Sequence, residues 1–199
     1  MPAAGNRRVR PIIGGIQIET DIRNATLGLV YADDLFATAG HAVGQPDSFV
    51  GQPGEADMMG QVVENFLANG ADIALVRVLV GVNATEDTVW VDVNSTQAVT
   101  FANQERPEEG ELLWLQGAQS GLVECSVYLT DADIVEPNSG EHVNNVVLLN
   151  LGVQTQPGDS GAPVTGQGTN LCYGIYGGRV VVEGVTYGWL TPFENLEWD

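Results

Sequence analysis

Short apolar runs that end in turn-forming residues constrain the fold of this 199-residue chain more than any other feature. Segments rich in Val, Ile and Thr alternate with turn signals such as Gly14-Gly15, Asn69-Gly70 and Pro157-Gly158. Their length and composition are typical of β-strands, and their spacing suits barrels better than alternating strands and helices. The sequence therefore predicts an all-β fold.

The expected strands cover most of the chain. They are Thr26 to Ala32, Leu35 to Ala39, Ile73 to Val80, Thr88 to Val93, Glu111 to Gln116, Leu122 to Leu129, Val143 to Val153, Ala162 to Thr165, Asn170 to Tyr176, Arg179 to Glu183 and Val185 to Leu190.

Helical and linker signals are few. Thr191 is a candidate cap, and Pro192 suits the first turn of a short helix that continues to Trp198. Two polar, turn-rich segments are Gly44 to Gly60 and Asn103 to Gly110. We interpret the second as a linker between two parts of the chain.

The chain is strongly acidic, with a net charge of −19, and all seven of its basic residues are arginines. Such a field repels phosphate backbones and anionic membrane surfaces, so we expect neither a nucleic acid nor a membrane as a partner. No run approaches about 18 consecutive apolar residues, and the N-terminal segment lacks the apolar core of a secretory signal. We therefore expect a cytoplasmic protein, unless the chain was cut from a longer precursor.

The cysteines and histidines are too few and too widely separated to form a metal-binding cluster. Cys125 and Cys172 are expected to be buried, reduced thiols rather than a disulfide. The loop from Gly158 to Gly161 lacks the Lys that a phosphate-binding loop needs. The sequence therefore predicts neither a metal nor a cofactor.

One histidine is a candidate catalytic base. His41 follows the strand-like run from Leu35 to Gly40, so it would lie at a strand end, whereas His142 lies in a polar stretch and is expected at the surface. A single histidine is more often structural than catalytic. His41 therefore needs support from a nucleophile elsewhere in the sequence.

A serine between glycines is the candidate nucleophile. Ser160 lies in Gln156-Pro157-Gly158-Asp159-Ser160-Gly161, where glycines permit a strained turn. Such a turn can expose the hydroxyl and aim the backbone amides of Gly158 and Ser160 at one point, as an oxyanion hole requires. An ordinary surface turn explains the same composition equally well.

Three motifs together resemble the active-site motifs of the chymotrypsin and trypsin family. They are Thr38-Ala39-Gly40-His41-Ala42, Asp72-Ile73-Ala74-Leu75-Val76 and Gly158-Asp159-Ser160-Gly161-Ala162-Pro163, in the family's order. The resemblance implies that Ser160 attacks the scissile carbonyl, His41 transfers the proton and Asp72 orients His41. It also implies that the amides of Gly158 and Ser160 form the oxyanion hole.

The resemblance further implies the architecture. We expect two packed six-stranded antiparallel Greek-key β-barrels with a short C-terminal helix. Residues 1–102 would form the first barrel, with His41 and Asp72, and residues 103–199 the second, with Ser160.

Weaker similarities concern substrate binding. Gly174-Ile175-Tyr176-Gly177-Gly178 looks like the strand that pairs with the substrate backbone, so Tyr176, Gly177 and Gly178 would line the cleft; a glycine-rich hairpin is the alternative. Gln154 stands where trypsin has an Asp, which disfavours cleavage after Lys or Arg. The two glycines suggest an open pocket for a neutral or apolar side chain.

The chain also departs from the family. Ile12-Ile13-Gly14-Gly15 looks like the family's activated N-terminus, but a first strand and its turn is the preferred interpretation because Pro11 precedes it. Asp159 is expected to turn inward and hold the loop, the alternative being a solvent-facing turn residue. Without a free N-terminus it would need another cation, and the sequence does not say which arginine.

The function predicted from these motifs is that of a serine endopeptidase acting on protein or peptide substrates. One alternative is a protease-like module that binds peptides without cutting them. Another is a restricted protease that stays latent until an activating protein partner orders its oxyanion loop.

Overall fold

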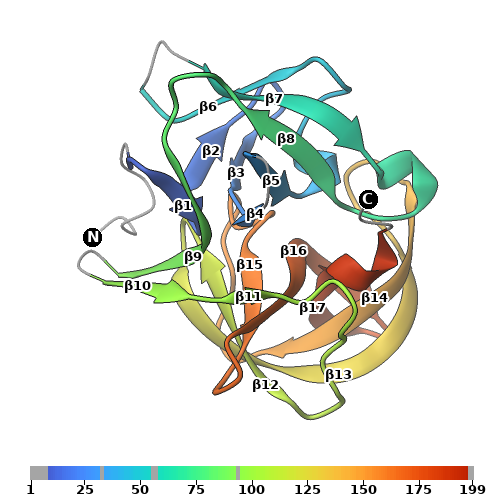
Figure 1. The fold of residues 1–199 in the computed structure, drawn as a ribbon. Coiled ribbons are helices and arrows are strands. Elements are labelled where there is room, and N and C mark those ends of the chain that lie inside the picture. Colours follow the sequence, from blue (N-terminus) through green and yellow to red (C-terminus); the bar gives the residue numbers. More distant parts are fainter. Residues whose placement is uncertain (1–8, 32–33, 55–57, 93–94, 197–199) are drawn as a thin grey trace.

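The computed structural model describes residues 9–31, 34–54, 58–92 and 95–196, and strands dominate these residues (Figure 1). The strands are β1 (Ile12–Gly14), β2 (Gln17–Glu19), β3 (Asn24–Thr26), β4 (Leu29–Tyr31), β5 (Leu35–Thr38), β6 (Phe49–Gly51), β7 (Met58–Asn65), β8 (Ala74–Val78), β9 (Ala84–Asp92), β10 (Ser95–Ala98), β11 (Thr100–Phe101), β12 (Leu112–Gly117), β13 (Gly121–Val135), β14 (His142–Leu151), β15 (Pro163–Gly166), β16 (Leu171–Val182) and β17 (Val185–Pro192). Three short 3-10 turns are η2 (Gly40–Ala42), η3 (Leu67–Asn69) and η4 (Phe193–Asn195).

The first large sheet has the order β3-β2-β6-β7-β8-β5-β4. Its two end strands, β3 and β4, are consecutive in the chain with only Leu27 and Gly28 between them. The amide of Leu27 donates to the carbonyl of Ile16, and that of Gly28 to the carbonyl of Ala37. One bent strand thus closes the sheet on itself, which gives the predicted six-stranded barrel.

The second large sheet closes through a direct ladder. Its order is β11-β16-β15-β12-β13-β14-β17, and β16 also pairs with β17. The six strands from β16 to β17 therefore form a closed barrel, to which the two-residue β11 adds a parallel edge. Figure 1 shows this sheet, from yellow-green to red, packed beneath the blue and teal one.

A third sheet of β1, β9 and β10 lies beside both. The amide of Ile12 donates to the carbonyl of Asn83, and the side chain of Ile12 is fully buried. This confirms the interpretation of Ile12 to Gly15 as a first strand and its turn. The division of the chain between residues 102 and 103 stays a prediction.

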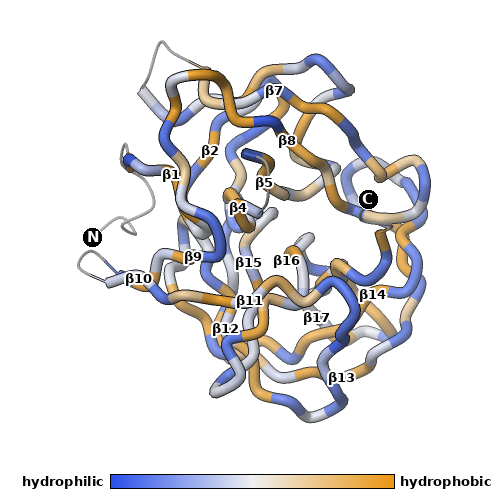
Figure 2. The backbone as a smooth tube through the Cα atoms, in the orientation of Figure 1, coloured by the Kyte–Doolittle hydropathy of each residue, from blue (hydrophilic) through white to orange (hydrophobic). Residues whose placement is uncertain are grey.

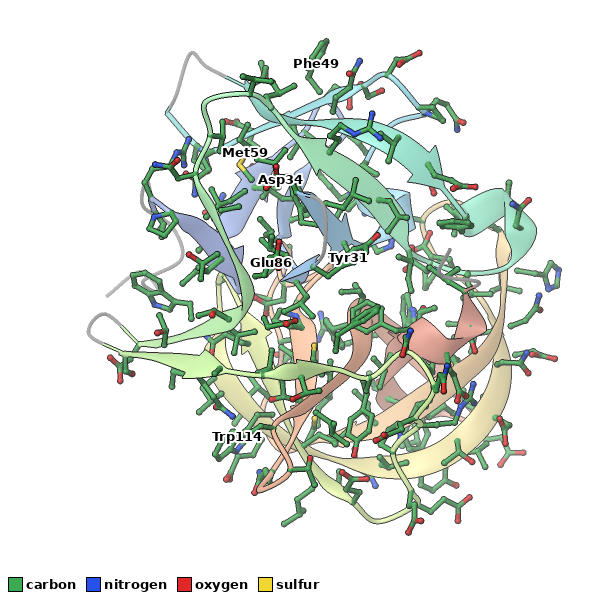
Figure 3. The ribbon with its side chains drawn as sticks, viewed as in Figure 1. Tyr31, Asp34, Phe49, Met59, Glu86 and Trp114 are labelled. Atoms are coloured by element: carbon green, nitrogen blue, oxygen red, sulfur yellow. The ribbon has the colours of Figure 1, made fainter. Side chains whose placement is uncertain are left out.

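Each barrel has its own apolar core. Hydrophobic and hydrophilic segments alternate along the chain (Figure 2), as half-buried strands require. Met59 of β7 is fully buried, whereas Phe49 of β6 points outward and is half exposed (Figure 3). The barrels therefore leave their outer faces to solvent and to loops.

Most predicted strands are present, but three predictions need correction. The C-terminal helix is wrong: Thr191 and Pro192 belong to β17, where they pair with Ile175 and Gly174, and only the single turn η4 follows. Because a ladder already holds their backbones, they cannot begin a helix. Trp198 lies outside the described residues, as do the predicted strand ends Ala32 and Val93.

The other two corrections concern strand continuity. The turn-rich segment Gly44 to Gly60 contains β6 and the start of β7. Both strands have buried residues, but the polar residues around them gave the segment the composition of a loop. The runs beginning at Asn170 and Arg179 form one strand, β16, because Gly177 and Gly178 bend it without ending it.

Several local predictions are confirmed. Cys125 and Cys172 are free and buried, and burial raises the pKa of both thiols to about 12. His142 is exposed.

A separate observation concerns helices: among the described residues, none is long and apolar enough to cross a membrane.

Arg106 ties the predicted linker to the second barrel. Its guanidinium donates to the carbonyl of Thr130 and to Asp131 at 2.6 Å, and it also pairs with Glu194 and Asn195 of η4. The Arg106 side chain is only 15% exposed. The segment from Asn103 to Gly110 is thus a clamped connection rather than a free tether.

Replacing Arg106 tests this clamp. Arg106→Ala should lower the free energy of unfolding by about 3 kcal/mol, because several charge-assisted hydrogen bonds are lost at a shielded site. Arg77 is exposed on β8, so Arg77→Ala should change the free energy of unfolding by less than about 0.5 kcal/mol. Equal effects of the two substitutions in urea denaturation would contradict the clamp.

Candidate active site

His41 lies on η2, directly after β5, and is buried. The side-chain amide of Asn65 donates to the carbonyls of Gly40 at 2.9 Å and Gly44 at 3.3 Å. A Cβ at Gly40 would lie 2.7 Å from the side-chain oxygen of Asn65, so a larger residue at this position would displace that side chain. Asn65 therefore fixes the turn that carries His41.

Asp72 precedes β8 and is fully buried beside His41. One carboxylate oxygen accepts the backbone amide of His41 at 2.8 Å, and the other lies 2.8 Å from His41 Nδ1. Since a carboxylate can only accept, Nδ1 carries the proton and Nε2 presents a lone pair. Asp72 thus fixes both the position and the tautomer of the imidazole.

The pKa of His41 reflects opposing influences. Burial favours the neutral ring and would lower the pKa, but attraction to Asp72 and the hydrogen bond to it act in the opposite direction. The charge of Glu136 adds to their effect, whereas Arg23 opposes it, and the pKa of His41 is raised above its ordinary value. The protonated ring is therefore stabilised where it stands.

Ser160 completes a hydrogen-bonded row. His41 Nε2 lies 3.2 Å from Ser160 Oγ, and this hydroxyl also lies 2.9 Å from the carbonyl oxygen of Gly177, to which it can donate. The structure thus brings together His41 and Asp72 of the first barrel with Ser160 of the second. The hydroxyl proton has two acceptors within reach.

Asp159 holds the loop from inside, as predicted. It is fully buried, and one oxygen accepts the amides of Gln119 and Ser120 at 2.9 and 3.0 Å. The other accepts the Ser120 hydroxyl at 2.5 Å and the amide of Gln156 at 2.7 Å. The expected cation is not needed: four neutral donors stabilise the carboxylate, and no arginine of the described residues pairs with it.

Thr26 joins the first barrel to this loop. Its amide donates to the carbonyl of Ser160 at 2.7 Å, and its hydroxyl donates to the carbonyl of Gly158 at 2.7 Å. The same hydroxyl accepts the amide of Ala118 at 3.1 Å. Glycine at position 161 allows this close approach of the two backbones. Its φ is +93°, and a Cβ there would lie 2.1 Å from the carbonyl oxygen of Thr26.

The two amides predicted to form an oxyanion hole are available. Neither the Gly158 nor the Ser160 amide donates to an acceptor within the described part of the chain, whereas the Asp159 amide donates to the carbonyl of Gln156. Gly158 has a φ of +102°, which favours glycine. The conformation therefore leaves two donors beside the Ser160 hydroxyl.

A cleft of about 850 Å³ opens beside the His41 and Ser160 end of this row. It is lined by His41 and Ser160 and by the predicted residues Tyr176, Gly177 and Gly178. The structure does not bring Gln154 to this cleft. Its side chain is exposed, and the following residue, Thr155, lines the wall and lies 2.7 Å from the hydroxyl of Tyr176.

Sequence reasoning missed several residues that shape the site. Asn65 and Thr26 act through single side-chain hydrogen bonds between distant segments, and no local pattern marks such contacts. Trp189 is buried, lines the cleft and would contact any Cβ at Gly177. Among the described residues, no group of three or more His, Cys, Asp or Glu side chains could hold a metal ion.

Comparisons with known proteins identify the fold. No protein-family model and no curated protein sequence matches the chain. Among solved structures, Cellulomonas bogoriensis chymotrypsin and Thermobifida fusca protease A each match with a TM-score of 0.75 and 20% identity over 92% of both chains. Nocardiopsis protease matches with a TM-score of 0.71 and 19% identity, covering 92% of this chain and 93% of its own. The chain thus has the chymotrypsin-like double-barrel fold.

The role of Asp159 can be tested by stability. Asp159→Asn should lower the free energy of unfolding by about 2–3 kcal/mol, since the new amide group would face a donor and the charge-assisted bonds are lost. Asp21 is exposed, so Asp21→Asn is a matched control with a change under about 0.5 kcal/mol. If guanidinium denaturation gave the same midpoint and slope for both variants, the loop would not depend on this carboxylate.

Proposed function

We propose that the chain is a serine endopeptidase that hydrolyses peptide bonds through a Ser-His-Asp triad and an acyl-enzyme intermediate. The observation that carries this proposal is the row from Asp72 through His41 to Ser160, with contacts of 2.8 and 3.2 Å. A nucleophile, a base with an exposed lone pair and an orienting carboxylate are the groups that acyl transfer needs. The fold of known serine proteases supports the same conclusion.

In the proposed first step, Ser160 Oγ attacks the carbonyl carbon of the scissile bond while His41 Nε2 takes the hydroxyl proton. The imidazolium that forms is stabilised by Asp72, which keeps its charge. Collapse of the tetrahedral intermediate expels the amine, which takes the proton from Nε2. Water then repeats the sequence on the ester and releases the acid.

The free amides of Gly158 and Ser160 would stabilise the negative oxygen of each tetrahedral intermediate. Thr26 supports this role because its hydroxyl holds the Gly158 carbonyl at 2.7 Å, which limits rotation of the peptide that follows. Asp159 holds the same loop from the other side. We infer that the oxyanion loop is set by the fold itself, which favours an intrinsically active enzyme over one that waits for a partner.

The second acceptor of the Ser160 hydroxyl suggests how substrate binding prepares the attack. The carbonyl of Gly177 lies on β16, the strand proposed to pair with the substrate backbone. A substrate amide that donates to this carbonyl would compete with the Ser160 hydroxyl. The hydroxyl would then donate to His41 Nε2, the geometry that attack requires.

Active-site labelling tests the proposal without knowledge of the substrate. A fluorophosphonate probe should form one adduct, located on Ser160 by mass spectrometry, and both Ser160→Ala and His41→Ala should lower labelling by about three orders of magnitude or more. Ser95 is exposed on β10, so Ser95→Ala should label like the parent.

The outcomes of labelling separate the candidate classes. An unlabelled protein that still binds peptides would be a protease-like binding module. Labelling that rises only when a protein partner is added would indicate a latent enzyme.

The pH dependence of labelling follows from the raised pKa of His41. The neutral ring is the active base, so the rate should rise with pH through a midpoint above the ordinary histidine pKa of 6.5. Asp72→Asn should lower the rate by about four orders of magnitude and move this midpoint to lower pH, because both the tautomer and the attraction are lost. Glu136→Gln should move it in the same direction by less. A midpoint unchanged in Asp72→Asn would contradict the assignment of His41 as the base.

A further inference from the structure

The cleft concentrates positive charge in a protein whose net charge is −19. Of the five arginines that the structure describes, Arg23 and Arg179 line the cleft. No Asp or Glu of the described residues lines it. The local charge of the cleft is therefore opposite to that of the whole chain.

Both of these guanidinium groups are unengaged. Within the described part of the chain, neither the Arg23 nor the Arg179 guanidinium forms a hydrogen bond or an ion pair, although both residues are partly buried. Arg106 shows the contrast, because its guanidinium is clamped by carbonyls and carboxylates. A guanidinium that is partly removed from water and lacks an anion is a ready site for a carboxylate.

The two arginines flank the catalytic row. Arg179 directly follows Gly178 on β16, opposite Gly188 of β17. Arg23 lies in the connection between β2 and β3 and is close enough to His41 to influence its pKa. A peptide that crosses Ser160 along β16 would therefore meet one guanidinium on each side of the bond to be cut.

The nearby carboxylates do not neutralise these arginines. The Asp72 carboxylate accepts hydrogen bonds from His41, and the Asp159 carboxylate accepts them from backbone amides and from the Ser120 hydroxyl. The Glu136 carboxylate accepts the amides of Asn138 and Ser139. At physiological salt, charges more than about 8 Å away are largely screened, so the distant acidic surface does not cancel the local field.

A pair of hydroxyls adds donor capacity to the same cleft. Thr155 and Tyr176 are buried, and their hydroxyl oxygens lie 2.7 Å apart. One O–H must donate to the other, which leaves a single O–H free for a ligand acceptor. Such a donor suits a carboxylate or carbonyl better than an apolar side chain.

We propose that the cleft selects acidic peptide segments, with Arg179 and Arg23 binding carboxylate side chains on the two sides of the scissile bond. This inference rests on the proposed peptidase function and names its substrate class. It replaces the neutral or apolar preference that the open glycines suggested from sequence. Arg179 and Arg23 would then determine specificity without taking part in bond cleavage.

The first test is a cleavage profile. The protein is incubated with a peptide library prepared from a whole proteome, and mass spectrometry locates the cut bonds. Asp and Glu should be enriched within about three residues of those bonds, the reach of an arginine side chain from an extended peptide. A profile with no acidic enrichment would overturn the inference.

The second test compares two fluorogenic peptides that differ only by Glu or Gln at the enriched position. For the parent, kcat/KM should favour the Glu peptide by roughly tenfold or more, the effect of one charge-assisted hydrogen bond. Arg179→Gln or Arg23→Gln should reduce this ratio toward one. Arg77→Gln removes the same charge from the exposed face of β8 and should leave the ratio unchanged. Thermal melting of each variant confirms that it folds.

Failure of this inference is distinguishable from failure of the peptidase proposal. If Ser160 is labelled but the Glu peptide is not preferred, or if the preference survives both cleft substitutions, the specificity inference is wrong and the peptidase proposal stands. If Ser160 is not labelled, fluorescence anisotropy of the same two peptides, labelled with a dye, measures binding directly. Equal affinities would then overturn the acidic preference as well, whereas tighter binding of the Glu peptide that is lost in Arg179→Gln would retain it.

Discussion

The close contact of two backbones at Thr26 is the constraint on which the candidate site depends. His41 and Asp72 come from the first barrel and Ser160 from the second, so their alignment requires the barrels to dock in one way. Thr26 donates from its amide to the carbonyl of Ser160, and Gly161 leaves the space for that approach. Gly28 meets the same region, where a Cβ would lie 2.9 Å from the carbonyl oxygen of Gly161. Because these contacts join backbone to backbone, they cannot shift with a side-chain rotamer, and they fix the relative positions of Asp72, His41 and Ser160.

Two buried carboxylates near this contact illustrate two ways to keep a charge inside a protein. Asp159 is surrounded by amides and one hydroxyl, so its charge is spread over neutral donors and serves only to hold the loop. Asp72 instead faces an imidazole whose protonation it favours. The bonds around Asp159 make its loop rigid. The charge of Asp72 instead raises the pKa of His41, a group that can exchange protons. Their separation lets the loop of Gly158 and Ser160 stay fixed while His41 changes its protonation state.

The sequence predicted the fold class from its strand pattern, and it pointed to the three residues of the row through the resemblance of three local motifs to those of a known family. Ser160 stands between glycines, and His41 follows a strand that alternation reveals. No sequence motif predicts the contacts of Thr26 and Asn65, since each depends on one hydroxyl or amide group that binds a segment far away in the chain. The helix predicted at Thr191 failed for a related reason: its cap and proline signals are local, whereas the ladder with β16 that overrides them is tertiary. Gln154 was misplaced because counting back from Ser160 assumes a loop of constant length.

The use of arginine as the sole basic residue connects these observations. A guanidinium carries a planar fork of donors that binds carbonyls and carboxylates in fixed directions. At Arg106 that fork is filled by the protein and fastens the connection between the barrels to the C-terminal turn. At Arg23 and Arg179 the same chemistry is left open beside the candidate nucleophile. A chain with a strongly negative surface can thus bind an anionic peptide, provided that its unpaired cations lie where solvent screening is weakest.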